Sequence, residues 1–176
     1  TALSTVGETF WWLVDVAYES QSGDAIIVGS GGSLNTVGYR VWNGTNWGTA
    51  TPIAAYTGSE PKQMKLVSNP KSDEMILIVN DVNEVDYAMV WNGSSWGNVI
   101  TLDNVNTQDR TDIYAAYESQ SGQGLIVYEG PTSSPSIYYR TWNGSSWGAQ
   151  SSLNAPTGPT GYTRWISIMR FYSIDC

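Results

Sequence analysis

The sequence contains no histidine and a single cysteine, and each shortage excludes a class of chemistry. Without histidine there are no Ser-His or Cys-His nucleophile pairs, no imidazole acid–base catalysis and few routes to a zinc site. The one cysteine is the last residue, Cys176, so no internal disulfide can form. We therefore expect neither a metal nor a cofactor.

Charged residues are also scarce: they make up 14% of the chain, against about 25% in an average domain. Eight Lys and Arg stand against sixteen Asp and Glu, which gives a net charge of -8 and a pI near 4.2. This balance lacks the basic patch that nucleic acid or anionic lipid requires. The longest apolar runs, such as residues 75–79, are far shorter than the roughly 18 residues of a membrane helix. We expect no nucleic-acid partner and no membrane insertion.

Aromatic and small polar residues are abundant instead. Nine Trp and eleven Tyr are more than the core of one 176-residue domain requires, and Ser, Thr, Asn and Gly provide the solubility. This composition suits an extracellular or cell-surface module better than a cytosolic enzyme. We expect residues 1–176 to form a single repeat domain.

A repeat of about 50 residues is the strongest signal in the sequence. The motif Trp-Asn-Gly-x-x-Trp-Gly occurs at 42–48, 91–97 and 142–148. A second motif, Ala-Tyr-Glu-Ser-Gln-Ser-Gly, occurs at 17–23 and again at 116–122. Because two motifs keep one period, the chain is predicted to contain three copies of one structural unit.

Each unit consists of short runs rich in Val, Ile, Trp and Tyr, separated by Gly, Ser and Asn, a pattern typical of strands. Asn-Gly between the last two runs predicts a hairpin turn, since both residues tolerate positive φ. We predict four strands per unit, at 10–18, 25–28, 37–42 and 47–53, at 64–67, 75–79, 87–91 and 96–102, and at 113–117, 125–128, 137–142 and 147–153.

Four antiparallel strands at this period predict the blades of a β-propeller. The expected fold is all-β, a propeller-like array with complete blades at approximately 10–53, 63–102 and 112–153 and a partial fourth from 163–172 with 1–4. A β-sandwich is the alternative, but it does not need identical turns at a constant period. Because unpaired strand edges invite pairing, we also expect self-association through the incomplete blade.

The units resemble the tandem propeller repeats found in large secreted and surface proteins of bacteria. The resemblance rests on Tyr-Glu-Ser-Gln-Ser-Gly, Ile-Ile-Val and Tyr-Arg-Val-Trp-Asn-Gly-Thr-Asn-Trp-Gly, and it covers residues 10–172. It implies a propeller fold and an extracellular or cell-surface location. The units are also distantly similar to the Asp-box repeats of sialidases, in which a Gly lies three residues before the Trp.

The sialidase catalytic residues do not carry over. Trp42, Trp91 and Trp142 stand where the box has Asp. The arginine triad is incomplete as well, because the middle unit has Met89 where the other two have Arg. A sialidase-like glycoside hydrolase is therefore only an alternative, and we expect no enzymatic activity.

A looser similarity links the hairpin to small propeller lectins that hold fucose with Arg, Glu and Trp. The first unit has Glu19 and Arg40, and the third has Glu118 and Arg140. A bidentate guanidinium and a carboxylate can grip sugar hydroxyls, so these four are the candidate ligand-binding residues. The alternative is a cross-strand ion pair at the surface, worth under about 1 kcal/mol.

Two weaker patterns complete the candidates. Residues 81–86, Asp-Val-Asn-Glu-Val-Asp, offer oxygen ligands but lack the Gly and the downstream Glu of a calcium loop, so an ordinary acidic turn is expected. Asn43, Asn92 and Asn143 each begin an N-glycosylation pattern. The same Asn-Gly pairs are explained by the turn.

The preferred function is a non-enzymatic extracellular binding or adhesion module with a glycan or a surface protein as partner. Its ligand-facing loops would be those that differ between units, at 54–61, 103–111, 30–36 and 130–136. The main alternative is a structural subunit of a self-assembling filament or oligomer.

Overall fold

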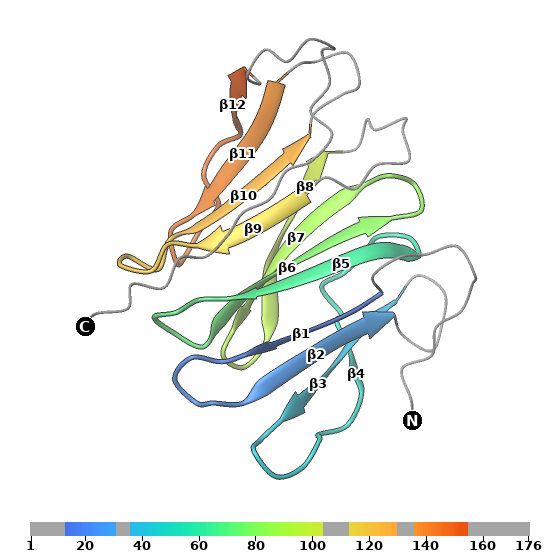
Figure 1. Ribbon diagram of the computed structural model, residues 1–176. Coiled ribbons are helices and arrows are strands. Elements are labelled where there is room, and N and C mark those ends of the chain that lie inside the picture. The colour runs from blue at the N-terminus through green and yellow to red at the C-terminus, as the bar shows by residue number, and fades with distance from the viewer. Residues whose placement is uncertain (1–12, 31–35, 104–112, 130–135, 155–176) are drawn as a thin grey trace.

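The computed structural model describes residues 13–30, 36–103, 113–129 and 136–154. These residues form three four-stranded antiparallel sheets (Figure 1). The predicted all-β class and the three four-stranded units are confirmed. The partial fourth blade, predicted from 163–172 with 1–4, lies outside the described residues.

Each sheet follows the order of the chain. Sheet 1 consists of β1 (Val14–Tyr18), β2 (Ala25–Ser30), β3 (Val37–Trp42) and β4 (Thr51–Pro52). Sheet 2 consists of β5 (Pro61–Ser68), β6 (Glu74–Asp81), β7 (Asp86–Asn92) and β8 (Trp96–Asp103). Sheet 3 consists of β9 (Ile113–Tyr117), β10 (Gly124–Glu129), β11 (Ser136–Trp142) and β12 (Ser151–Asn154).

The last strands of sheets 1 and 3 are shorter than predicted. Trp47 and Trp147 each form an isolated bridge to the Trp at the other side of their hairpin, and regular pairing resumes only at β4 and β12. In sheet 2 the strand β8 begins at Trp96 itself, and its ladder with β7 has register shifts between Ala88 and Val90 and between Asp86 and Tyr87. Such shifts are typical of β-bulges, which let a strand continue past an extra residue.

The Trp-Asn-Gly turns explain why the motif repeats. Gly44, Gly93 and Gly144 have φ of +85°, +90° and +90°, a region that favours glycine. The preceding Asn does not adopt positive φ in any copy. Its side chain instead accepts hydrogen bonds from the backbone, as Asn43 Oδ1 does from the N–H groups of residues 45 and 46 at 3.1 and 2.8 Å.

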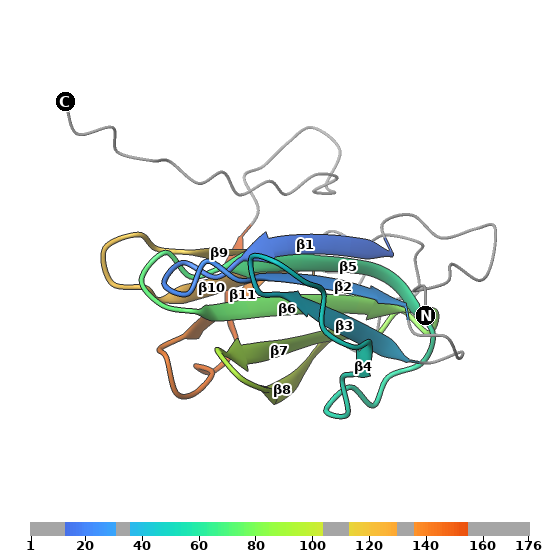
Figure 2. The same ribbon diagram turned by 90° about the horizontal axis from the view of Figure 1, so that it is seen from below.

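The three sheets stack face to face, with the first strands β1, β5 and β9 as neighbours (Figure 2). We call the face of a sheet that lies toward the preceding sheet its N-side face, and the opposite face its C-side face. Met64, Leu66 and Leu77 on the N-side face of sheet 2 pack against sheet 1. Ile76 and Ile78 on its C-side face pack against sheet 3.

Sheet 2 is therefore buried on both faces, and β6 shows it most clearly. Its run 75–79 is at most 1% exposed at every position. A half-buried strand alternates apolar and polar residues, whereas a strand covered on both sides is apolar throughout. Each such side chain contributes about 1.5–3 kcal/mol by leaving water.

Candidate functional site

The two edges of the stack differ in character. The β1–β2, β5–β6 and β9–β10 turns lie at one edge, at the left in Figure 1, together with the Trp-Asn-Gly turns; we call it the turn edge. The β6–β7 loop and the connection from sheet 1 to sheet 2 lie at the opposite edge, which we call the loop edge. The Trp-Asn-Gly turn recurs in all three sheets and the β1–β2 turn sequence recurs at β9–β10, while the loop sequences do not recur. Binding residues that are specific to one unit are therefore expected at the loop edge, where the sequences vary.

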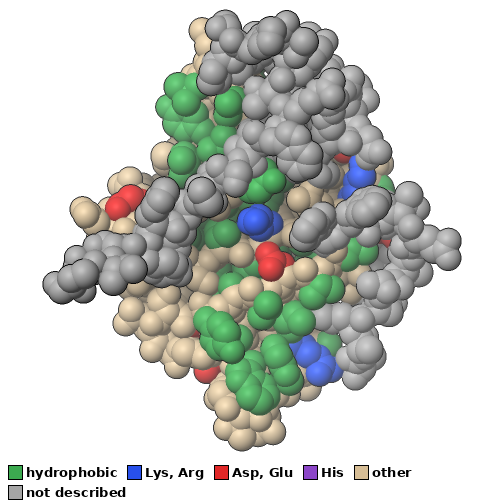
Figure 3. All heavy atoms as spheres, in the orientation of Figure 1, with side chains coloured by type: hydrophobic (Ala, Val, Ile, Leu, Met, Phe, Trp, Pro, Cys, Tyr) green, Lys and Arg blue, Asp and Glu red, His purple; other side chains and the backbone are tan. Residues whose placement is uncertain are grey.

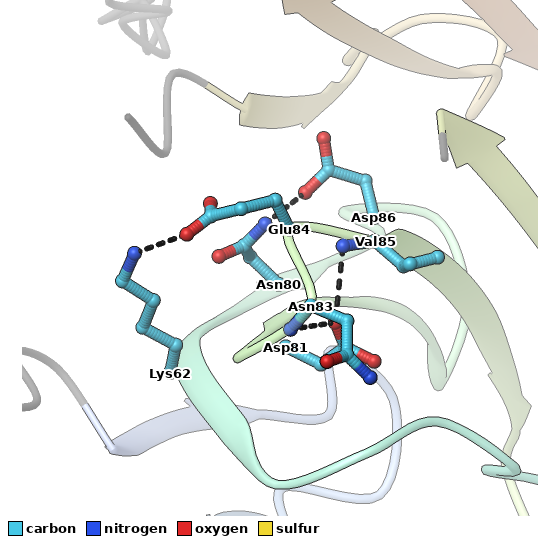
Figure 4. A network of polar contacts seen from close by, with 7 residues as sticks. All are labelled: Lys62, Asn80, Asp81, Asn83, Glu84, Val85 and Asp86. Atoms are coloured by element: carbon cyan, nitrogen blue, oxygen red, sulfur yellow. Dashed lines mark hydrogen bonds and ion pairs between the residues drawn. The ribbon is translucent and has the colours of Figure 1, made fainter. Parts of the chain in front are cut away.

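A buried carboxylate organises the loop edge of sheet 2. Asp81, which is 0% exposed, accepts hydrogen bonds at Oδ1 from the N–H groups of Asn83 (2.9 Å) and Val85 (3.0 Å). Its Oδ2 accepts a third from the N–H of Ser59 at 2.9 Å. The same side chain thus holds the β6–β7 loop, through the two hydrogen bonds drawn in Figure 4, and also the sheet 1–sheet 2 connection through Ser59.

Two tyrosines lie against this carboxylate. Tyr56 and Tyr87 meet edge to face with ring centroids 5.4 Å apart, and the Tyr56 hydroxyl donates to the carbonyl of Ser59 at 2.6 Å. Burial, followed by the negative charge of Asp81, raises the pKa of both hydroxyls. Both tyrosines therefore stay neutral at physiological pH and fix the loop without adding charge.

Next to Asp81 lies a second polar group, around Glu84. Lys62 Nζ and Glu84 Oε1 form an ion pair at 2.6 Å, with side chains 15% and 18% exposed. Asn80 Nδ2 donates to Asp86 Oδ1 at 2.9 Å, and Asn80 is 1% exposed. Figure 4 shows the Glu84 side chain between Lys62 and Asp86.

Three buried acceptor atoms of this group lack a donor within the described part of the chain. They are Gln63 Oε1, Asn80 Oδ1 and Glu84 Oε2. Gln63 and Asn80 are direct partners in the β5–β6 ladder, and Asn80 pairs with Asp86 in the β6–β7 ladder. Buried oxygens without a donor are rare in proteins, so a row of them distinguishes this edge of sheet 2.

The segment 81–86 was expected to be an ordinary acidic turn, and its turn character is correct. Sequence reasoning missed its burial and its links to Ser59, Lys62 and Asn80. Glu84 has a φ of +59°, unusual for a residue other than glycine. In the described residues no group of three or more metal-ligating side chains occurs.

Glu19 and Arg40 are not brought together by the structure. The Glu19 carboxylate is 6% exposed and lies toward sheet 2, where Oε1 accepts from Trp91 Nε1 at 2.5 Å and Oε2 from the Ser22 hydroxyl. Arg40 pairs with Ile27, which pairs with Val16, so it belongs to the N-side face of sheet 1. The two side chains are on opposite sides of their sheet.

Glu118 and Arg140 are likewise separate. Glu118 is exposed and binds its own turn, accepting from the N–H groups of Gln120 (2.7 Å) and Ser121 (2.5 Å). Hydrogen bonds from Ser121, side chain first and then backbone, lower the pKa of Glu118. Arg140 Nη1 donates to the carbonyl of Gly148 at 2.9 Å.

Asn43, Asn92 and Asn143 are exposed in the Trp-Asn-Gly turns, with each side-chain oxygen held by the backbone of its turn. Their modification stays a prediction.

No protein-family profile matches the sequence, and no curated protein matches it. Within the described ranges, no helix is long and apolar enough to cross a membrane.

Proposed function

We propose that the chain is a non-enzymatic, extracellular or cell-surface binding module, built as a propeller-like array, that takes a carbohydrate at its loop edge. Support for the array comes from the identical strand order of the three sheets and from their repeated N-side-on-C-side stacking. In such an array the connecting loops of successive blades gather around one rim and can be varied without changing the blades.

The observation that carries the proposal is the row of buried acceptors at the loop edge of sheet 2. Gln63 Oε1, Asn80 Oδ1 and Glu84 Oε2 have no donor in the described part of the chain. Sugar hydroxyls are donors, and each of them can also accept. A polyhydroxylated ligand therefore satisfies acceptors that the described protein leaves unpaired, which is the usual source of polar specificity in a binding site.

Glu84 also forms the ion pair with Lys62, and both side chains of this pair are partly exposed. The Lys62 ammonium is a donor for ring or hydroxyl oxygens, and the Glu84 carboxylate is an acceptor for hydroxyl protons. Tyr56 and Tyr87 lie close enough to Asp81 for its charge to raise the pKa of both hydroxyls, after burial as the larger cause. We therefore assign ligand contact to Lys62 and Glu84, and a supporting role to Asp81.

The test is glycan binding by the intact chain. A panel of immobilised neutral and acidic oligosaccharides identifies a bound glycan, and titration calorimetry then measures its dissociation constant. Glu84→Ala removes two acceptors and Lys62→Met removes the ammonium. Each is expected to weaken binding at least about tenfold, or 1.4 kcal/mol.

Lys71→Met is the matched control, because Lys71 is an exposed lysine at the turn edge. It is expected to leave the dissociation constant unchanged, and melting curves show whether each variant is folded. A glycan bound equally well by all variants places the site elsewhere. A chain that binds no glycan at millimolar concentration contradicts the carbohydrate proposal and leaves a surface protein as the partner.

A further inference from the structure

The N-side face of sheet 1, which also carries Arg40, exposes apolar side chains of β1 where the corresponding side chains of sheet 3 are covered. Val14, Val16 and Tyr18 are 49%, 54% and 64% exposed. Their counterparts 99 residues later, Ile113, Ala115 and Tyr117, are 2%, 4% and 6% exposed because they pack against sheet 2. In Figure 3 hydrophobic side chains gather over β1 and β2, in the lower part of the view.

The same face carries two tryptophans whose counterparts are used in the internal contacts. Trp91 and Trp96 of sheet 2 meet Tyr39 of sheet 1 at centroid distances of 5.5 and 6.1 Å. The corresponding residues of sheet 1 are Trp42 and Trp47, and Trp47 is 45% exposed. Sheet 1 therefore presents the kind of aromatic and apolar side chains with which sheets 2 and 3 dock, together with Arg40, which holds the position of Arg140 in sheet 3.

The opposite end of the stack presents the complementary set. Ile26 of sheet 1 and Ile76 of sheet 2 are fully buried on C-side faces, whereas Leu125, which holds the same register position in sheet 3, is 37% exposed. Tyr139 holds the position of Tyr39 and is partly exposed. Glu118 holds the position of Glu19 and is exposed.

We infer that the N-side face of sheet 1 docks on the C-side face of sheet 3 of a second copy of this chain, with Glu118 accepting a hydrogen bond from the indole N–H of the second copy's Trp42. The contact continues the internal interfaces: sheet 1 meets sheet 2, and sheet 2 meets sheet 3, through the same pairs of faces. One chain already contains two interfaces between an N-side face and a C-side face. A third interface of the same kind needs the C-side face of a sheet 3, and a second copy of this chain provides one. The inference is independent of the proposed glycan site, which lies at the loop edge.

The stoichiometry follows from the sheet count. The described residues of each chain supply three sheets, so those of two copies supply six and those of three copies supply nine. Closed propellers contain about four to eight blades, so two copies close a ring and three do not. We expect a two-chain ring with two equivalent contacts.

The first test measures mass by light scattering at 1–100 µM, a range of about two decades around typical dimer affinities. The intact chain is expected to have the mass of two chains. Val16→Glu places a carboxylate in the contact and is expected to weaken association about 100-fold or more. Val82→Glu is the matched control, because Val82 is an exposed valine (38%) at the loop edge, and it is expected to leave the mass unchanged.

The second test locates the contact by disulfide trapping. Inside the chain, Asp15 Oδ2 accepts from Leu66 N–H at 2.7 Å, so these positions are adjacent across an interface. By register, Tyr114 of sheet 3 corresponds to Asp15, and Val16 of sheet 1 to Leu66. With Cys176→Ser in all proteins, oxidation of mixed Val16→Cys and Tyr114→Cys chains is expected to give a linked pair, whereas Val82→Cys with Tyr114→Cys gives none.

Three results overturn the inference: a single-chain mass at 100 µM, an equal response to Val16→Glu and Val82→Glu, or no linked pair from Val16→Cys and Tyr114→Cys. The variant Ile168→Glu tests whether the segment 163–172, rather than sheet 3 of the second copy, covers the N-side face of sheet 1. If Ile168→Glu alters the mass and Val16→Glu does not, the segment 163–172 mediates association and the direct contact of sheets 1 and 3 is wrong.

Discussion

The indole N–H of Trp91 donates a 2.5 Å hydrogen bond to the buried carboxylate of Glu19, which lies 72 residues earlier and in the neighbouring sheet. The bond belongs to a series of contacts between the first turns of sheets 1 and 2. The Ser20 hydroxyl donates to the carbonyl of Asn69 at 2.5 Å, and Asp73 accepts from the N–H groups of Gln21 and Ser22 at 2.6 and 3.0 Å. Polar turns, as well as apolar faces, therefore set how the sheets stack.

Trp91→Phe is expected to destabilise the protein by about 1–3 kcal/mol, because it removes a donor from a buried carboxylate. Trp142→Phe is the matched control. Trp142 occupies the same place in sheet 3 and is buried, but its Nε1 has no acceptor in the described part of the chain. Urea denaturation measures both variants, and equal losses contradict a specific role for the Glu19 bond.

Asp81→Ala leaves the N–H groups of Ser59, Asn83 and Val85 without their acceptor. We expect a loss of about 3 kcal/mol in the free energy of unfolding, since three partly buried donors lose their acceptor at once. Asp81→Asn keeps one side-chain oxygen and is expected to cost less. If thermal unfolding shows Asp81→Ala within about 0.5 kcal/mol of the wild type, the carboxylate does not organise the loop edge.

Gly44→Ala is expected to cost about 1–2 kcal/mol, because an L side chain is strained at the φ of +85°. Space is not the cause, since a Cβ at this position would meet nothing within 4 Å. Gly97→Ala is the matched control: it too would meet nothing within 4 Å, and its φ is not positive. Denaturation curves that place the two variants together contradict the turn argument.

Glu118 is expected to titrate below its ordinary pKa of 4.5, because Ser121 and Gln120 donate hydrogen bonds to its ionised form. The stability gained from these bonds is complete above the unfolded pKa and is lost as pH falls through the lower folded pKa. Ser121→Ala is expected to move the pKa back toward 4.5, while Ser119→Ala does not. Carboxyl NMR titration measures this, and an unchanged pKa in Ser121→Ala refutes the assigned cause.

The strand pattern was predictable because its causes are local. Apolar runs, polar breaks and the Trp-Asn-Gly turn lie within a few residues of one another, and they recur at a constant period. The lengths of β4 and β12 were not predicted, since the motif Trp-Asn-Gly-x-x-Trp-Gly is shared by all three sheets, yet after Trp47 and Trp147 the ladder is interrupted.

The candidate site was less predictable because its causes are non-local. Tyr-Glu-Ser-Gln-Ser-Gly is identical at 18–23 and 117–122. Glu19 is nevertheless buried against Trp91, while Glu118 is exposed and binds its own turn. The difference is set by the neighbouring sheet, which the motif does not encode. The burial of Asp81 depends in the same way on Ser59, 22 residues earlier.

Because sheet 2 is buried on both faces, the end sheets are expected to unfold locally before sheet 2 does. Within a single chain each sheet is stabilised by its neighbours, so an end sheet loses one interface where the middle sheet loses two. When sheet 1 or sheet 3 of a single chain detaches, sheet 2 keeps one partner, and both faces of the 75–79 segment reach water only when both end sheets have detached. The amide protons of β6 record global unfolding, and those of β1 and β12 record fraying.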